Sequence, residues 1–195
     1  MPNTLVTLYL KCSGVMRRLR RFLWAFDLRM RGVKIGKRLK VRGPIYVVGG
    51  RNITIGDDCI LYDNVYLNAF GEGRITIGNK CSINRMTIIN CHESVTLGDR
   101  VHIGPMCFIT DQDHTAAPGR DAKGLPGVTS PVVIEGPGGA AAGCIILRGV
   151  RLGPRTIVAA GAVVTHSFPG KAIIAGVPAQ VLKERPEFEG EVIVD

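Results

Sequence analysis

Aliphatic residues recur at every sixth position along most of the chain, and the positions between them are largely polar residues and glycine. A period of six fits neither the 3.6-residue period of an α-helix nor the two-residue alternation of a simple hairpin strand. It predicts a short strand followed by a turn, three times per coil, so that about eighteen residues close one triangular coil. The repeating positions are Ile35, Val41, Val47, Ile55, Leu61, Leu67, Ile77, Ile83, Ile89, Leu97, Ile103, Ile109, Ile134, Ala140, Ile146, Leu152, Val158 and Val164.

A longer repeat covers the first half of the chain. The segment Ile53-Thr-Ile-Gly-Asp-Asp-Cys59 returns in similar form at residues 75–81 and 95–101, at spacings of 22 and 20 residues. Spacings of this length are typical of stacked coils that each contact only their neighbours. These spacings are longer than one plain coil. The extra residues predict small insertions at one corner, at residues 49–52, 71–74 and 91–94.

A small or β-branched residue often stands four places after the aliphatic position, where a small side chain fits an inner corner. Four of the six cysteines occupy this place, which predicts buried structural thiols. No CxxC pair occurs, so a zinc site is not expected, and the default compartment is the cytoplasm, where thiols stay reduced. The residues at this place are Cys59, Val65, Cys81, Thr87, Val101, Cys107, Cys144, Val150, Thr156 and Ala162.

The last coils carry a specific motif, Leu152-Gly-Pro-Arg-Thr-Ile-Val-Ala-Ala-Gly-Ala-Val-Val-Thr165, followed by Ala175-Gly-Val-Pro-Ala179. With this motif and its repeats, the chain resembles the hexapeptide acyltransferases over about residues 33–184. Within that family it is similar to the galactoside, maltose and exopolysaccharide types of sugar O-acetyltransferase. The resemblance implies an all-β fold, a left-handed parallel β-helix. The handedness comes from the family alone, because right-handed crossovers are the rule elsewhere.

Three parts of the chain follow from these patterns. Residues 1–32 are predicted to form a basic amphipathic helical segment, and residues 33–183 the catalytic β-helix, with one extruded loop at residues 110–131. Residues 184–195 form an acidic tail, for which a short helix or a disordered end is expected.

The six-residue pattern breaks once, where 25 residues separate Ile109 from Ile134. The inserted stretch contains His114, and a long loop on a rigid scaffold is a usual place for chemistry. Acyl transfer from a thioester to a hydroxyl needs a base, and an imidazole is largely ready to accept a proton at pH 7. Asp111 or Asp113 could orient the ring. The resemblance implies the same role for His114, because a histidine of this loop is the general base in the family.

Asn84 is the second catalytic candidate. It follows the aliphatic position Ile83, so its side chain should point outward. The family has a substrate-positioning asparagine 30 residues before its histidine, and Asn84 and His114 keep that spacing. An ordinary turn-capping asparagine is the alternative.

The resemblance also implies the acyl donor, acetyl-CoA, bound in a groove between adjacent subunits of a homotrimer, with no metal. Small residues along the later coils would let the pantetheine arm approach the backbone, whose N–H groups could bind its amides. Two further residues match positions near the nucleotide end. The candidates for binding the donor are Ala142, Gly143, Ala160, Gly161, Thr165 and Lys183.

One position departs from the family pattern. Residues 134–141 read Ile-Glu-Gly-Pro-Gly-Gly-Ala-Ala, and Gly139 stands where the family usually has tryptophan. The change predicts a more open wall that could tolerate a longer acyl chain, or weakened activity.

Positive charge is concentrated near the N-terminus. Residues 1–43 contain twelve Lys or Arg and one acid, a net +11, whereas the rest of the chain is close to neutral at −2. Apolar residues at helical spacing within residues 3–31 predict a helix that either lies on an anionic membrane or caps the prism, and both interpretations stay open. No apolar run approaches the roughly 20 residues that span a bilayer, and no signal peptide is recognised. The expected location is the cytoplasm, with peripheral contact at the inner face of the membrane as a further option.

The predicted function is acetyl-CoA-dependent O-acetylation of a saccharide hydroxyl, with surface polysaccharide biosynthesis as the commoner setting. No nucleic-acid partner is expected. Two alternatives are N-acetylation of an amino-sugar nucleotide and a structural β-helix with weakened catalysis.

Overall fold

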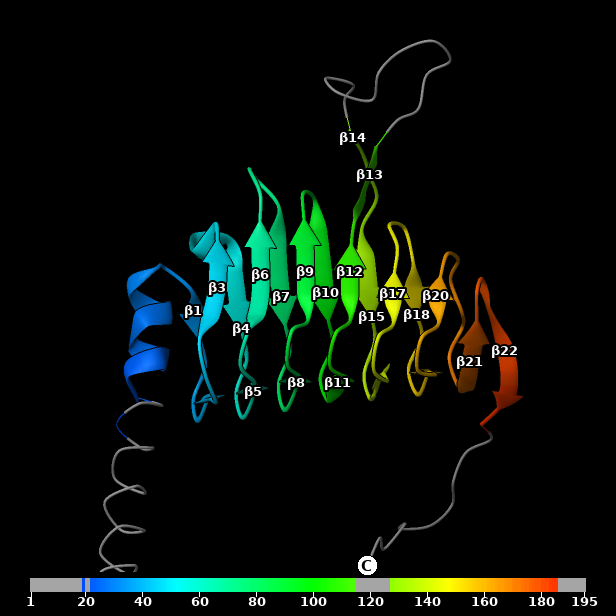
Figure 1. Ribbon diagram of the computed structural model, residues 1–195, viewed down its shortest axis with the longest axis horizontal. Coiled ribbons are helices and arrows are strands. Elements are labelled where there is room, and N and C mark those ends of the chain that lie inside the picture. Colours follow the sequence, from blue (N-terminus) through cyan, green and yellow to red (C-terminus); the bar gives the residue numbers. More distant parts are fainter. Residues whose placement is uncertain (1–18, 20–21, 115–126, 186–195) are drawn as a thin grey trace, which may run out of the picture.

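The computed structural model describes residues 19, 22–114 and 127–185. These residues wind into a parallel β-solenoid whose coils stack along one axis, with one short helix at the N-terminal end (Figure 1). Each coil adds one strand to each of three parallel sheets, which form the three sides of a prism. The predicted β-helix is therefore confirmed.

The strands of the three sheets follow one another in a regular order along the chain. The first sheet contains β1 (Lys34–Ile35), β4 (Ile53–Ile55), β7 (Arg74–Ile77), β10 (Ser94–Leu97), β15 (Val132–Ile134) and β18 (Arg151–Leu152). The second contains β2 (Lys40–Val41), β5 (Ile60–Leu61), β8 (Ser82–Ile83), β11 (Val101–Ile103), β16 (Gly138–Ala140), β19 (Ile157–Val158), β21 (Ala172–Gly176) and β22 (Ala179–Glu184). The third contains β3 (Ile45–Val48), β6 (Val65–Ala69), β9 (Ile88–Cys91), β12 (Phe108–Thr110), β17 (Ile145–Ile146) and β20 (Val163–Val164).

The predicted aliphatic positions line the inside of the prism. Ile55, Ile77 and Leu97 are buried and lie in register on neighbouring strands, so the same place in each coil stacks on the next. Burial of such side chains is the main favourable term in folding. Two aliphatic positions of the first coil, Ile35 and Val47, are only partly buried, whereas Val41 of the same coil is fully buried.

The inner corners hold the predicted cysteines. The Cys59 thiol donates to the carbonyl oxygen of Gly78 at 3.1 Å, and the Cys81 thiol donates to that of Gly98 at 3.0 Å. The five cysteines in the described residues are buried and free of disulfides, which confirms structural thiols there. Cys12 lies outside the described residues.

A ladder of side-chain oxygens joins consecutive coils at the corner between the first and second sheets. Asp57 Oδ1 accepts the backbone N–H of Lys37 at 2.7 Å, and Asn79 Oδ1 accepts that of Asp57 at 2.8 Å. Asp99 Oδ1 then accepts the N–H of Asn79 at 2.7 Å. The ladder satisfies backbone donors that the turns would otherwise leave unpaired.

The three predicted insertions lie at the corner between the third and first sheets, and the first contains a 3₁₀-helix, η1 (Gly50–Asn52). At the C-terminal end, β22 folds back antiparallel on β21 and continues through Glu184. The predicted tail beyond residue 185 lies outside the described residues.

The N-terminal helix covers residues 22–30 of the described chain, and the rest of the predicted helical segment lies almost wholly outside it. Leu28 is 1% exposed, and Trp24 and Ala25 pack against the core. The helix therefore caps the first coil, as one of the two interpretations predicted. Within the described residues, no helix has the length and hydropathy needed to cross a bilayer.

Candidate active site

The predicted extruded loop begins as a β-hairpin. Beyond the third sheet, β13 (Gln112–His114) pairs antiparallel with β14 (Gly127–Thr129) and stands out from the stack (Figure 1). The extruded segment therefore leaves the prism as a paired hairpin, in which the outgoing and returning chains satisfy each other's backbone groups. Residues 115–126 lie outside the described residues.

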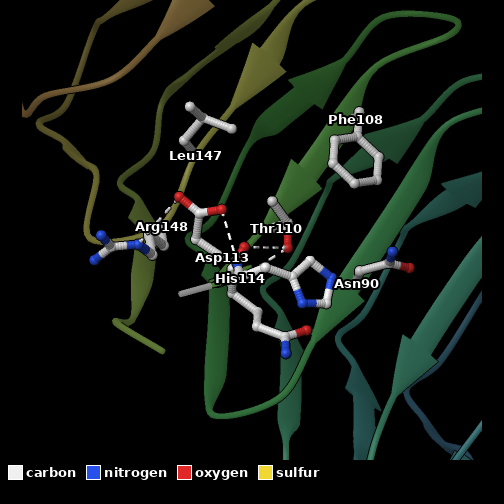
Figure 2. A pocket seen from close by; sticks show the side chains of 8 residues that line it. Asn90, Phe108, Thr110, Asp113, His114, Leu147 and Arg148 are labelled. Atoms are coloured by element: carbon white, nitrogen blue, oxygen red, sulfur yellow. Dashed lines mark hydrogen bonds and ion pairs between the residues drawn. The ribbon is translucent and has the colours of Figure 1, made fainter. Parts of the chain in front are cut away.

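His114 lines a pocket between this hairpin and the outer face of the third sheet. The pocket has a volume of about 320 Å³. In Figure 2 the imidazole of His114 points toward Asn90, and Asp113 points toward Arg148. An exposed imidazole beside amide, hydroxyl and guanidinium groups can hold and deprotonate a polar acceptor. The lining residues are Asn90, Phe108, Thr110, Gln112, Asp113, His114, Leu147 and Arg148.

Asp113 holds the backbone next to the imidazole. Its Oδ1 accepts the backbone N–H of His114 at 2.8 Å, and its Oδ2 lies 3.8 Å from Nε of Arg148. The carboxylate therefore restrains the strand that carries His114 and links it to the following coil. The structure does not show the expected contact between this carboxylate and the imidazole ring.

Asp111 does not face the pocket. It is fully buried, with 0% of its surface exposed. Its Oδ1 accepts the backbone N–H of His92 at 2.8 Å, and its Oδ2 accepts those of Glu93 and Ser94 at 2.8 and 2.7 Å. The prediction that Asp111 orients the catalytic ring is wrong, because these donors in the preceding coil occupy both carboxylate oxygens.

The buried carboxylate also affects a neighbouring thiol. The Cys91 thiol donates to Asp111 Oδ2 at 3.4 Å. Burial, together with the nearby negative charge of Asp111, raises the pKa of Cys91 to about 12. A thiol in this state stays protonated and unreactive at neutral pH.

Asn84 lies on a different corner from His114. It sits between the second and third sheets, where its Oδ1 accepts the backbone N–H of Arg85 at 2.9 Å. Asn84 precedes β9 whereas His114 follows β12, and these strands are parallel neighbours, so the two side chains lie at opposite ends of the third sheet. One chain alone does not bring them together.

The small residues predicted to contact the donor occupy the same corner as Asn84, in the last two coils. Gly143 and Gly161 have left-handed backbones, with φ of 69° and 71°, and a Cβ at either would meet open space. Their N–H groups donate to the carbonyl oxygens of Pro105 and Ala142 at 2.8 and 2.9 Å. These two backbone N–H groups are therefore not available to a ligand. The surface beside them, which includes the exposed Ala160, is open.

The two remaining candidates for binding acetyl-CoA lie elsewhere. Thr165 is exposed after β20, on the corner that carries the hairpin, and its hydroxyl lies 3.4 Å from Nδ1 of His166. Lys183 is exposed on β22, opposite Ile173 of β21. The six residues predicted to bind acetyl-CoA thus lie at two corners of the prism and at one end of the second sheet within a single chain.

Gly139 does not open a wall. It lies on β16 between His102 and Ile157 of the neighbouring strands, and it is buried. A Cβ at this position would overlap the carbonyl oxygen of His102. The expectation of a vacated tryptophan site is therefore wrong, because the backbone itself occupies the space.

Asn90 and Arg148 are among the pocket residues that were not predicted from the sequence. Asn68 Nδ2 donates to Asn90 Oδ1 at 2.9 Å, and Asn90 lies in register with Thr110 on the next strand. The available signal was an asparagine one place after the inward-facing residue in two successive coils. Arg148 follows β17 and carried no pattern that would single it out.

His102 lies on β11, where its Nδ1 is 2.8 Å from the hydroxyl of Ser82. This pair belongs to the second sheet and not to the pocket. Among the side chains that the structure describes, no group of three His, Cys, Asp or Glu could hold a metal ion.

Comparison of sequences supplies relatives but no matching family model. The chain is 30% identical over 152 residues to WbbJ of Escherichia coli K12, named as a lipopolysaccharide biosynthesis O-acetyl transferase; the match covers 74% of this chain and 78% of WbbJ. It is 47% identical over 64 residues to a 2,3,4,5-tetrahydropyridine-2,6-dicarboxylate N-acetyltransferase of Staphylococcus aureus strain JH9. That match covers 33% of this chain and only 27% of the relative.

Solved structures share the fold. A mutant of AntD, an N-acyltransferase from Bacillus cereus in complex with dTDP-4-amino-4,6-dideoxyglucose and coenzyme A, superposes with a TM-score of 0.73 at 22% identity, covering 84% of this chain and 90% of AntD. The hexapeptide-repeat acetyltransferase VCA0836 from Vibrio cholerae, complexed with acetyl coenzyme A, gives a TM-score of 0.62 at 24% identity, covering 83% and 76%.

Proposed function

This chain belongs to the hexapeptide-repeat acetyltransferase family and is therefore an acyltransferase; on that premise we propose that it transfers the acetyl group of acetyl-CoA to a saccharide hydroxyl, with His114 as the general base. The observation that carries the proposal is the place of His114, on a hairpin that projects from the prism and beside a pocket lined by both polar and apolar side chains. The name of the relative WbbJ supports a hydroxyl acceptor.

The reaction is a direct transfer. The imidazole of His114 removes the proton of the acceptor hydroxyl, whose oxygen attacks the thioester carbonyl carbon. The resulting tetrahedral oxyanion collapses, the carbon–sulfur bond breaks, and the leaving thiolate takes the proton back from the imidazolium. Atoms and charges balance without a covalent enzyme intermediate. Backbone N–H groups near the carbonyl would stabilise the oxyanion.

The site is proposed to lie between two copies of the chain in a homotrimer. Asn84 and the open surface at Gly143 and Gly161 share one corner, whereas His114 and Thr165 share another. Because one chain keeps these corners apart, a neighbouring copy would have to supply the second corner. In the proposed site Asn84 positions the acceptor, and the small residues receive the pantetheine arm.

Release of CoA from acetyl-CoA, measured with a panel of saccharides, tests the proposed activity. Mass spectrometry of the product then identifies an ester. His114→Ala is expected to lower kcat/KM by roughly 10²–10⁴-fold, the usual contribution of a general base. His102→Ala, an exposed imidazole on another face, is the matched control and should keep wild-type activity. Full activity in His114→Ala would remove this histidine from the mechanism.

A mixing experiment tests the shared site. Two inactive variants, His114→Ala and Asn84→Ala, are coexpressed with different tags and the mixed oligomer is purified. Activity should return in the mixture, because some interfaces then combine an intact His114 with an intact Asn84. A mixture as inactive as its parents would show that each chain forms its own site. A monomeric mass in light scattering would also exclude the trimer.

Two alternatives have distinct outcomes in the same assays. The Staphylococcus relative is named as an N-acetyltransferase, so an amine acceptor such as an amino-sugar nucleotide is the second candidate, and an amide product would establish it. A structural β-helix without catalysis would bind no acetyl-CoA in calorimetry.

The proposed place of the reaction is the cytoplasm, where acetyl-CoA is made and buried cysteines such as Cys59 and Cys144 stay reduced. Biosynthesis of a surface polysaccharide is the proposed setting, in keeping with the name of WbbJ.

A further inference from the structure

The N-terminal helix carries an apolar stripe on the side that faces away from the prism. We use "apolar stripe" for Leu19, Phe22, Leu23, Phe26 and Met30. All five side chains are exposed, from 49% at Leu19 to 63% at Phe22 and 72% at Met30. Phe22 and Phe26 stack on each other, with ring centroids 6.4 Å apart. Exposed large side chains gathered in this way usually mark an interaction surface.

The stripe is separate from the face that caps the prism. At about 100° per residue, Leu28 lies on the side of the helix opposite Phe26 and Met30. Leu28 is buried against the first coil, with Trp24 and Ala25 beside it. The cap therefore accounts for three of the helix's apolar side chains, and the five side chains of the stripe need a different partner.

Basic residues are frequent in the sequence around the stripe. The segment of residues 1–43 carries twelve Lys or Arg and one acid, and that acid, Asp27, already forms an ion pair with Arg31 at 2.9 Å. Arg29 lies at the edge of the stripe on the helix surface, and Lys34 on the first strand is also exposed. A helix with an apolar face bordered by basic residues is typical of one that lies in the interface of an anionic bilayer.

We propose that the apolar stripe and its basic border dock the protein on an anionic lipid surface. The stripe would enter the boundary between headgroups and acyl chains, and the arginines would meet the lipid phosphates. A second copy of the chain is a poorer occupant, because contact through the stripe would bring two segments of net +11 together. The contact is independent of the chemistry at His114.

The test is cosedimentation of the full chain with lipid vesicles at about 0.15 M salt. Vesicles of mixed phosphatidylglycerol and phosphatidylcholine should bind the protein at least about tenfold more strongly than vesicles of phosphatidylcholine alone. The double variant Phe22→Ser/Phe26→Ser should lose at least about tenfold in binding to the mixed vesicles. Because both rings are exposed, the variant should keep the wild-type melting temperature and the wild-type rate of CoA release with a free saccharide.

The matched control is Val177→Ser/Leu182→Ser, which removes two similarly exposed apolar side chains, 72% and 69% exposed, at the other end of the prism. It should bind mixed vesicles like the wild type. Equal binding of the stripe variant and the wild type would overturn the proposal, as would equal binding to both kinds of vesicle. A lower native mass of the stripe variant in light scattering would instead assign the stripe to contacts between copies and would also overturn it.

Discussion

The carboxylate of Asp111 accepts the backbone N–H of His92 at 2.8 Å, which joins the root of the hairpin that carries His114 to a corner of the preceding coil. The backbone carbonyl of Asp111 in turn accepts the N–H of Ser130 at 2.9 Å, on the returning side of the hairpin. One residue thus connects both sides of the hairpin to the rigid stack. The exposed pair of Asp113 and Arg148 adds a second, weaker connection.

The first prediction concerns this buried carboxylate. Asp111→Ala leaves the three part-buried backbone donors of His92, Glu93 and Ser94 without their acceptor, and loss of a hydrogen bond at a donor shielded from water costs about 1–3 kcal/mol. We expect the free energy of unfolding to fall by about 3 kcal/mol or more, as measured by urea denaturation. Asp113→Ala is the control, since its exposed ion pair should contribute less than about 1 kcal/mol. Similar unfolding midpoints for both variants would contradict this account of Asp111.

The second prediction concerns Asn90. Its Oδ1 accepts from Asn68, which leaves its Nδ2 group to donate to an acceptor bound beside His114. Asn90→Ala should therefore lower kcat/KM for acetyl transfer by roughly tenfold, the effect of one lost hydrogen bond of about 1.4 kcal/mol. Asn68→Ala, one coil further from the pocket, should have a smaller effect. An equal loss in both variants would point to the stability of the ladder and not to binding.

The third prediction concerns Gly139. Restoring the tryptophan that resembling enzymes carry should destabilise this chain by at least about 1–3 kcal/mol, because any Cβ at residue 139 overlaps the carbonyl oxygen of His102. Thermal unfolding of Gly139→Trp measures the effect. Ile157→Trp, on the adjacent strand and the same outer face, provides the comparison and should be tolerated better. A stable and more active Gly139→Trp variant would instead support the more open wall that was predicted from the sequence.

The fourth prediction concerns the thiols. Cys59, Cys81, Cys91, Cys107 and Cys144 are buried, so a thiol reagent such as dithionitrobenzoate should not react with them quickly in the folded protein. Cys12→Ser removes the one cysteine outside the described residues, so no thiol of that folded variant should react quickly with the reagent. All five thiols should then react after unfolding in urea. Rapid reaction of the native Cys12→Ser protein would contradict the burial.

The fifth prediction concerns acid stability. Hydrogen bonds from the backbone and side chain of Asn79 lower the pKa of Asp99 in the folded chain. A lowered pKa contributes stability that is present above the unfolded value of about 3.9 and is lost as the pH falls below it. Asp99→Asn should therefore show a smaller drop in melting temperature between pH 5 and pH 3 than the wild type. Identical drops would assign the acid sensitivity to other carboxylates.

The inward-facing core could be predicted from the sequence because it repeats. Ile55, Ile77 and Leu97 occupy equivalent places in successive coils, and a column of such residues can bury its side chains only in the observed register. The break in the repeat likewise predicted where the chain leaves the prism. Handedness and the docking of neighbouring copies have no comparable signal, since neither changes the spacing of apolar residues.

The site was harder to predict because its residues lie outside the repeat. Nothing in the spacing distinguishes Asp111 from Asp113, yet one is buried and the other is exposed. The difference depends on the backbone donors of Glu93 and Ser94, which come from the preceding coil and become neighbours only through stacking. Gly139 was misinterpreted for a related reason. Whether a side chain fits at residue 139 depends on how closely β11 approaches β16, which the spacing of apolar residues does not show.

The hairpin leaves the fourth coil of the stack, counted from the helix that covers the first. With strands about 4.8 Å apart and a helix about 10 Å thick, His114 stands roughly 25 Å from a bilayer on which the apolar stripe rests. On the proposed membrane contact, the number of coils before the hairpin would set the height of His114 above the lipid surface. Inserting one further coil before residue 94 would raise His114 by about one strand spacing, roughly 4.8 Å.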